Sequence, residues 1–327
     1  MRRTASEKME IVRLVEGTEL PVRATLRQLS VPRSTFYGWY QSYLALGFDG
    51  LQDKKPAHRA RWNTIPKAIQ KQVLELALER TELSPRELAC HYTDEKRYFV
   101  SESSVYRILK EADLITSPAY VLMSASDAFQ HPTTRVHEMW QTDFTYFRII
   151  GWGWYYLSTV LDDFSRYIIA WKLTSTMGTT DVTETLDRAL AVTGADQVQV
   201  KHRPRLLSDN GPAYVSGELR EYLHERGMGH TRGAPYHPQT QGKIERYHRS
   251  MTNVVKLEHY YFPWELDSAI RDFVAYYNNE RYHESLNNVT PADVYFGRQH
   301  AVLTERSKIK RITMQRRKRE YRANKAA

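Results

Sequence analysis

Three acidic residues occupy positions from which their carboxylates could act together. Asp143 lies within a predicted apolar strand, Asp209 directly follows the short apolar run 205–208, and Glu245 lies in a segment with helical periodicity. An acid inside an apolar strand costs free energy unless its charge is compensated, and sites collect at the carboxyl ends of strands in α/β sheets. If the strands that carry the two aspartates are neighbours, the helix can bring Glu245 over them, and three carboxylates converge.

Such a cluster predicts a magnesium site. Carboxylates gathered without a cation repel one another and raise each other's pKa, whereas Mg²⁺ is a hard cation that prefers oxygen ligands. Two ions about 4 Å apart suit phosphodiester chemistry, because one lowers the pKa of the attacking water or 3′-hydroxyl and the other stabilises the leaving oxygen. We therefore expect Asp143, Asp209 and Glu245 to be both catalytic residues and ligands of two Mg²⁺ ions, for which Mn²⁺ can substitute.

Each acid alone also has an ordinary structural interpretation. Asp209 begins an Asp-Asn-Gly sequence typical of a turn, and a glutamate on a helix is usually just solvated. Asp162 and Asp163 compete for a ligand role, but we interpret them as residues of a hairpin turn, with Asp163 near Arg166. The residue types, their order and spacing, and the predicted secondary structure around them together favour Asp143, Asp209 and Glu245 as the metal ligands.

The elements that must position these acids follow a mixed α/β order. Periodicity changes after residue 135, where runs of strand type begin, separated by Gly-Trp-Gly at 151–153 and by Asp-Asp-Phe-Ser at 162–165. Later segments have helical periodicity, and the longest of them carries Glu245. The predicted strands are 140–150, 154–161, 166–173, 205–208 and 228–231, and the predicted helices are 182–190, 216–226 and 242–259.

The first hundred residues predict two helix-turn-helix units. Helices at 6–16 and 22–29 are followed by a third that begins at Pro32, a residue suited to a first helical turn. Residues 100–106 align without gaps over 31–37, which suggests that a second unit repeats the first. Side chains in the first turns of such recognition helices reach major-groove base edges. The candidates for this contact are Arg33, Ser34, Tyr37, Ser103, Ser104 and Arg107.

Composition favours a polyanionic partner. The net charge of the 327-residue chain is +9, and residues 306–325 hold ten Lys or Arg against one acid, Glu320. We expect this tail to be disordered when free and to contact DNA phosphates, with Arg316, Arg317, Lys318 and Arg319 as candidates.

Other features bound the location and chemistry of the chain. Cys90 is the single cysteine, so neither a disulfide within the chain nor a cysteine-based zinc site can form. No apolar run approaches the roughly 20 residues that span a bilayer, and the N-terminus lacks the pattern of a signal peptide. We expect a cytoplasmic, nucleoid-associated protein with no membrane partner.

The predicted organisation is multidomain α/β, with helix-turn-helix units, a mixed-sheet core and a helical, basic C-terminal region. The predicted parts are a helix-turn-helix at 1–52, a linker at 53–63, a second such unit at 64–116, a linker at 117–135, the catalytic core at 136–260 and the C-terminal region at 261–327.

Several motifs together resemble one family, the bacterial insertion-sequence transposases whose core is of the retroviral-integrase type with an Asp-Asp-Glu triad. The motifs are WQTD (140–143), LDDFSR (161–166), SDNG (208–211), HPQTQGKIER (237–246) and YYNN (276–279), followed by Arg281, His283 and Thr290-Pro291. The resemblance implies a ribonuclease-H-like fold, Mg²⁺ dependence, recognition of terminal inverted repeats and assembly of several copies on DNA. It also implies that Gln241 lies near target DNA and that Arg249 contacts the element end; Lys243, in the same motif, is a further candidate for DNA contact.

The resulting hypothesis is a transposase that binds double-stranded DNA at element ends and target, cleaves strands and transfers them. One alternative is a catalytically silent DNA-binding regulator derived from such an enzyme. A structure-selective nuclease, which would cut without joining, is a third hypothesis. The zinc module of retroviral integrases is not expected, because its cysteines are absent.

Overall fold

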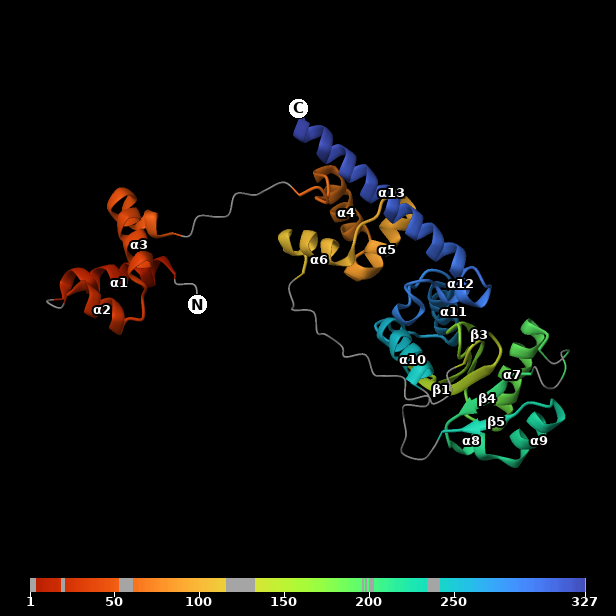
Figure 1. Ribbon diagram of the computed structural model, residues 1–327. Coiled ribbons are helices and arrows are strands. Elements are labelled where there is room, and N and C mark those ends of the chain that lie inside the picture. Colours follow the sequence, from red (N-terminus) through yellow and green to blue (C-terminus); the bar gives the residue numbers. More distant parts are fainter. Residues whose placement is uncertain are drawn as a thin grey trace. The chain divides into compact units, whose positions relative to one another are not determined.

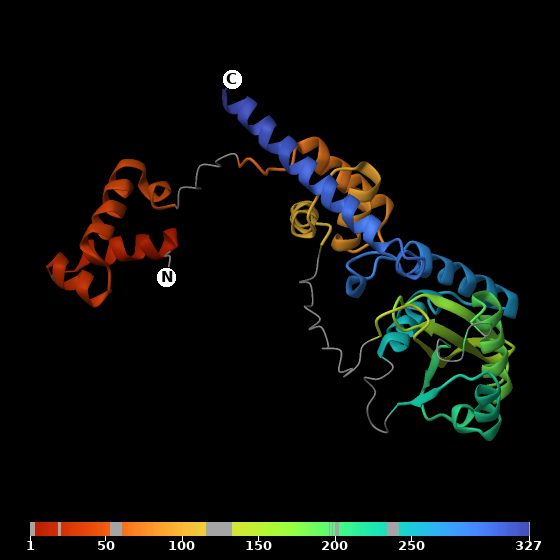
Figure 2. The same cartoon turned by 45° about the vertical axis from the view of Figure 1, so that its right-hand side comes forward.

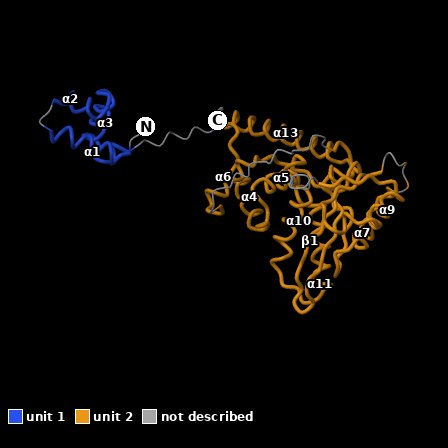
Figure 3. The backbone as a smooth tube through the Cα atoms, turned by 90° about the horizontal axis from the view of Figure 1, so that it is seen from below, with its two compact units in different colours: residues 1–61 blue, residues 62–327 orange. Residues whose placement is uncertain are grey.

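The computed structural model describes residues 4–18, 21–52, 61–115, 133–195, 197, 199, 203–233 and 242–326 (Figure 1). The chain divides into two compact units, Met1–Arg61 and Trp62–Ala327 (Figure 3). The first unit is wholly helical, and the second contains a further helical set, a sheet with its helices, and the C-terminal helix. The finer boundaries expected from the sequence stay predictions.

The first unit has the three helices predicted for a helix-turn-helix. They are α1 (Ala5–Gly17), α2 (Val22–Gln28) and α3 (Arg33–Leu46), followed by the 3₁₀ turn η1 (Gly47–Leu51). The Thr4 side chain accepts a hydrogen bond from Glu7 N–H and the Glu7 carboxylate accepts one from Thr4 N–H, which caps α1. The core holds one apolar side of each helix, namely Ile11, Val12, Val15, Leu26, Val31 and Phe36.

The second unit begins with the other predicted set of three helices. These are α4 (Lys67–Glu79), α5 (Pro85–Lys96) and α6 (Glu102–Glu111). Ser84 caps α5 together with Glu87, and Pro85 takes its first position. Val73, Leu88, Tyr92, Val105 and Ile108 belong to the buried core of this set.

A five-stranded mixed sheet follows, in the order β3-β2-β1-β4-β5 (Figures 1 and 2). Strands β1, β2 and β3 are antiparallel neighbours, whereas β4 runs parallel to both β1 and β5. This arrangement confirms the predicted ribonuclease-H-like core, and it makes the first and fourth strands neighbours, which is the condition set for the meeting of the two aspartates. The strands are β1 (Met139–Ile149), β2 (Gly153–Asp162), β3 (Ile168–Thr174), β4 (Arg205–Ser208) and β5 (His230–Arg232).

The helices of the core cover both faces of this sheet. Side chains alternate along a strand, so Val160 of β2 packs with α7 (Thr179–Thr193), α8 (Pro212–Val215) and α9 (Gly217–Glu225). Leu157 and Leu161 point the other way, into the apolar cluster formed with α10 and α11. Helix α10 spans Gly242–Val255, four residues short of the predicted end, and α11 spans Pro263–Asn279.

The basic tail is a helix, which corrects the expectation of disorder. After α12 (Pro291–Tyr295), α13 runs over Gln299–Ala326. Ile309, Thr313 and Arg317 are spaced by one turn on the same side of α13 and are all buried. Thr313 Oγ1 accepts a hydrogen bond from Phe99 N–H at 3.0 Å. Contact with the α4–α6 set therefore orders a segment whose composition alone predicts disorder.

An ion pair reinforces the contact between α13 and α5. The Arg306 guanidinium donates hydrogen bonds to both carboxylate oxygens of Asp94, at 2.8 and 2.6 Å. Tyr282 donates to the same carboxylate at 3.1 Å. These contacts tie the second helical set to the C-terminal region within the second unit.

Among the residues that the structure describes, no helix combines the length and the apolar character needed to cross a membrane.

His283, in the segment between α11 and α12, is a partly buried imidazole. Its ring lies 5.1 Å from that of Tyr277. Burial, together with the smaller effect of the positive charges of Arg281, Arg166 and Arg246, lowers the pKa of His283 to about 3. The unfolded chain therefore takes up a proton near pH 6.5, whereas the folded chain does so only near pH 3.

This difference predicts that the free energy of unfolding falls as the pH falls from 6.5 toward 3. Because the lowered pKa means that only the unfolded chain binds the proton in this window, the loss approaches about 2 kcal/mol between pH 7 and pH 5. His283→Leu should remove this component. Urea unfolding of both proteins at pH 5, 6 and 7 measures the difference, and profiles that run parallel would contradict it.

Candidate active site

Asp143 and Asp209 lie at the same level of two neighbouring parallel strands. Gln141 of β1 pairs with Leu207 of β4, and each aspartate follows its member of this pair by two residues. Asp143 lies within β1, which continues to Ile149, whereas Asp209 directly follows the end of β4. The two strands that carry the aspartates are therefore neighbours, as the predicted meeting of their carboxylates requires.

Asp143 is partly exposed, with 22% of its side chain accessible. Its Oδ1 accepts a hydrogen bond from Phe144 N–H at 2.8 Å, and its Oδ2 lies 3.5 Å from Nδ1 of His248. His248 belongs to α10 and is 8% exposed. The sequence analysis did not single out His248, although its position three residues after Glu245 places it one turn further along the same helix.

Asp209 stands at the surface, and its carboxylate has one backbone partner. Gly211 N–H donates to Oδ1 at 2.9 Å, and a Cβ at Gly211 would lie only 3.1 Å from that oxygen, so glycine leaves room for the carboxylate. Partial burial raises the pKa of Asp209, the Gly211 hydrogen bond lowers it, and the negative charge of Asp143 raises it. The negative charge of Asp143 therefore makes ionisation of the Asp209 carboxyl less favourable.

Glu245 lies exposed on α10. Within the described residues, no three His, Cys, Asp or Glu side chains form a group that could hold a metal ion. The meeting of three carboxylates therefore stays a prediction, and the side chain of α10 that lies beside Asp143 is the imidazole of His248.

The residues present nevertheless fit a hard divalent cation. Asp143 and Asp209 supply oxygen ligands from neighbouring strands, and the negative charge of Asp143 raises the pKa of Asp209. A cation between them would remove this repulsion. Glu245, three residues before His248 on α10, is the nearest acid along that helix to complete the set.

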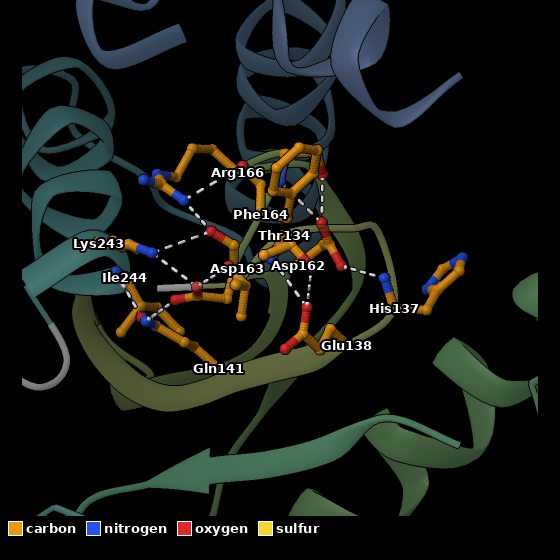
Figure 4. Close-up of polar contacts among 12 residues, drawn as sticks. Thr134, His137, Glu138, Gln141, Asp162, Asp163, Phe164, Arg166, Lys243 and Ile244 are labelled. Carbon is orange, nitrogen blue, oxygen red and sulfur yellow. Dashed lines mark hydrogen bonds and ion pairs between the residues drawn. The ribbon is translucent and has the colours of Figure 1, made fainter. Parts of the chain in front are cut away.

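Asp162 and Asp163 lie at the turn between β2 and β3, as interpreted, but both are buried (Figure 4). The Asp162 carboxylate accepts hydrogen bonds from the backbone N–H groups of His137 and Ser165 and from the Ser165 hydroxyl. Arg166 donates to the main-chain oxygen of Asp163. The Asp163 carboxylate pairs with Lys243 instead, at 2.6 Å. No local pattern in the sequence predicts that partner, which is 80 residues away.

The residues predicted to contact DNA fall into distinct environments. On the recognition helices, Ser104 is half-buried, while Arg33, Ser34, Tyr37, Ser103 and Arg107 are exposed. Arg249 is exposed on α10, and Gln241 lies outside the described residues. Lys243 differs, because its ammonium is held by Asp163 and only 10% of the side chain is accessible.

The predicted cations of the tail also separate. Arg317 is buried and donates to Tyr98 Oη at 2.8 Å and to the Phe99 carbonyl at 2.7 Å. Arg317, which the sequence suggested as a DNA contact, therefore has hydrogen-bond partners within the protein. Arg316, Lys318 and Arg319 remain exposed. Lys318 and Arg319 line a shallow open groove together with Gln315 and Arg322.

Comparison with protein families agrees with this architecture. Residues 133–238 match a family described as Integrase core domain, and residues 226–291 match another of the same description. Residues 7–61 match a Helix-turn-helix domain family, and residues 35–109 match a Homeodomain-like domain family.

Known proteins match over the same core. The Gag-Pro-Pol polyprotein of mouse mammary tumor virus is 31% identical over 132 residues, which is 39% of this chain and 7% of the polyprotein. The transposase for insertion sequence element IS629 of Shigella sonnei is 34% identical over 100 residues, which is 30% of this chain and 31% of that protein. The chain thus spans a small part of the polyprotein and about a third of the transposase. The HTLV-2 integrase catalytic core domain, solved in complex with magnesium, aligns with 49% of this chain and 97% of its own, at 20% identity and a TM-score of 0.39.

Proposed function

We propose that this protein, which carries an integrase core domain behind helix-turn-helix domains, is a transposase that binds the terminal inverted repeats of a mobile element and cleaves and transfers DNA strands. The observation that carries the proposal is the placement of Asp143 and Asp209 on neighbouring parallel strands of the core. The negative charge of Asp143 raises the pKa of Asp209, which supports a shared role for the two carboxylates in binding a cation.

The proposed site uses three residues of this chain. Asp143 and Asp209 would hold Mg²⁺, two ions in all or Mn²⁺ in their place, and Glu245 would complete the ligand set. Divalent cations bound there lower the pKa of an attacking water or 3′-hydroxyl and stabilise charge on the leaving oxygen. The same carboxylates could then serve both strand cleavage and strand joining, because in each reaction an oxygen nucleophile, water or a 3′-hydroxyl, attacks a DNA phosphate.

The proposed partner is double-stranded DNA, at the element ends and at the target. The exposed polar side chains Arg33, Ser34 and Tyr37 at the start of α3 suit contact with base edges. Ser103 and Arg107 occupy the matching exposed turn of α6. Assembly of several copies on DNA and association with the nucleoid belong to the same proposal.

The decisive experiment uses DNA that carries the inverted repeats flanking the gene. The protein is incubated with this DNA and Mg²⁺, and strand cleavage and joining are resolved on sequencing gels, with shuffled repeats and with EDTA as controls. Cleavage followed by joining that requires both the repeat and the metal is the expected result. Repeat-specific binding without any cleavage would favour the silent regulator, and cleavage without joining would favour the nuclease.

The exposed face of α13 predicts a component of binding that ignores sequence. Replacing Lys318, Arg319 and Arg322 with Gln should weaken binding to all duplexes alike, because each cation neutralises a phosphate and releases counterions. The slope of log affinity against log salt should then decrease by about 2 to 3. Fluorescence anisotropy from low to high salt measures it.

A buried cation of the same helix provides the matched control. Arg317→Gln should lower the stability of the folded protein and leave the salt slope nearly unchanged, because Arg317 contacts Tyr98 and Phe99. A loss of affinity confined to the inverted repeats in the triple variant would contradict the assignment of α13 to phosphate contact.

A further inference from the structure

A buried polar bridge joins the core sheet to the first turn of the helix that carries Glu245 (Figure 4). Asp163 at its centre is 1% exposed. Its Oδ1 accepts a hydrogen bond from Gln141 Nε2 at 2.6 Å, and its Oδ2 accepts one from Lys243 Nζ at 2.6 Å. Lys243 also donates to the main-chain oxygen of Asp163, at 3.2 Å. We call Gln141, Asp163 and Lys243 the 141–163–243 bridge.

The bridge also caps α10. The first N–H groups of a helix have no partner within the helix, and the N–H of Ile244 donates to Gln141 Oε1 at 3.1 Å. Gln141 is completely buried. Its amide group thus bonds the Asp163 carboxylate through nitrogen and the α10 backbone through oxygen, which fixes its orientation from both ends.

A second contact links the same strand to the same helix. Asp143 follows Gln141 by two residues on β1, so both side chains point to the same face of the sheet. Gln141 meets Ile244, and Asp143 meets His248 one turn later. Glu245 lies between these two points of attachment along α10. The position of its carboxylate relative to Asp143 therefore depends on how β1 and α10 are held together.

The chemistry of the bridge favours a geometric role over a stabilising one. The desolvation cost of a buried ion pair largely offsets its attraction, so apolar residues of similar size often stabilise a core as well or better. Hydrogen bonds donated to a buried carboxylate, however, define direction in a way that apolar contacts do not. A bridge of this kind is suited to a helix whose register must be kept.

We propose that the 141–163–243 bridge is a positioning unit that sets the register of α10 against β1 and thereby places Glu245 for its role beside Asp143. The inference rests on the proposed function, since it assigns Glu245 a catalytic task. It gives Lys243 a task inside the protein, different from the DNA contact that the sequence suggests. Gln141, Asp163 and Lys243 act through Glu245 and touch neither DNA nor the reacting atoms.

The test compares two lysines that both form ion pairs within the core. Lys243→Met removes the ammonium of the bridge, and Gln141→Met removes the amide while keeping similar volume. Lys172→Met is the control, because Lys172 pairs with Asp181 and Glu184 between β3 and α7, away from α10. Cleavage of repeat-containing DNA gives kcat and KM, Mn²⁺ titration gives metal affinity, and hydrogen exchange reports the first turn of α10.

Both bridge variants should lower kcat and Mn²⁺ affinity by about tenfold to a hundredfold. Their KM for DNA should stay near that of the wild type, because the bridge does not touch DNA. Hydrogen exchange of the peptide spanning 242–247 should accelerate in both, and Lys172→Met should match the wild type in every measurement. Lys243→Arg, which keeps the charge, should recover part of the lost kcat.

Two results would overturn the inference. One is wild-type kcat and Mn²⁺ affinity in both bridge variants, even with a lowered melting temperature, since the bridge would then only stabilise the fold. The other is unchanged hydrogen exchange at 242–247. If the wild-type protein itself neither cleaves DNA nor binds Mn²⁺, the proposed function fails, and faster exchange in the bridge variants would still establish that the bridge holds α10.

Discussion

Asp209→Asn should abolish strand cleavage and joining while leaving DNA binding and folding intact. Asparagine keeps the size of the side chain and an oxygen that can accept the Gly211 hydrogen bond, but it removes the negative charge that would hold a divalent cation. Because metal-assisted phosphodiester chemistry depends on that charge, we expect a loss of about three orders of magnitude or more. Single-turnover cleavage of repeat-containing DNA measures it.

The control makes the same change at an acid of α7 that is no part of the proposed site. Asp187 of α7 is an acid that pairs with Arg226 at 3.0 Å and is about half exposed, so Asp187→Asn should cleave like the wild type. Circular dichroism and repeat binding should agree among all three proteins. An Asp209→Asn variant that keeps more than a tenth of wild-type cleavage would remove Asp209 from the active site.

Trp140→Ala should produce the largest loss of stability of any single change considered. Trp140 lies on β1 next to Leu206 of β4 and is completely inaccessible to solvent. Its indole N–H also donates to His137 Nδ1 at 3.2 Å. Truncating a buried tryptophan removes apolar contacts and leaves a cavity, which costs about 3 to 5 kcal/mol. Urea unfolding followed by far-ultraviolet circular dichroism measures the difference.

A second tryptophan on the same hairpin is the control. Trp152, in the turn between β1 and β2, is 55% exposed. Trp152→Ala should change stability by about 0.5 kcal/mol at most. Equal losses in the two variants would show that burial at β1 does not dominate the stability of the core.

The structure also changes how two predicted DNA-contacting cations are understood. Lys243 and Arg317 carry the charge that suggested DNA contact, yet each donates to buried partners within the protein. Charge is visible in a sequence, but the partner of a charge is not. The exposed cations of α13 and the exposed residues at the start of α3 and α6 remain the proposed DNA contacts.

The sequence by itself determined the elements of this protein, because local interactions specify them. Runs of strand type separated by turn residues predict β1 and β2, and the short run before Asp209 predicts β4. Each signal involves residues within a few positions of one another. The same local order placed Asp143 within a strand and Asp209 just after one, which made their meeting depend only on whether the two strands are neighbours.

Only the tertiary structure decided which side chains share an environment. Lys243 meets Asp163 across 80 residues, and Arg317 meets Tyr98 across 219. Helix α13 is ordered along a face that contacts Phe99, and His248 of α10 lies beside Asp143. These contacts depend on how helices pack against the sheet and against one another. The free energy of a buried charge depends on neighbouring groups that can be far away in the sequence, so local sequence patterns do not predict it.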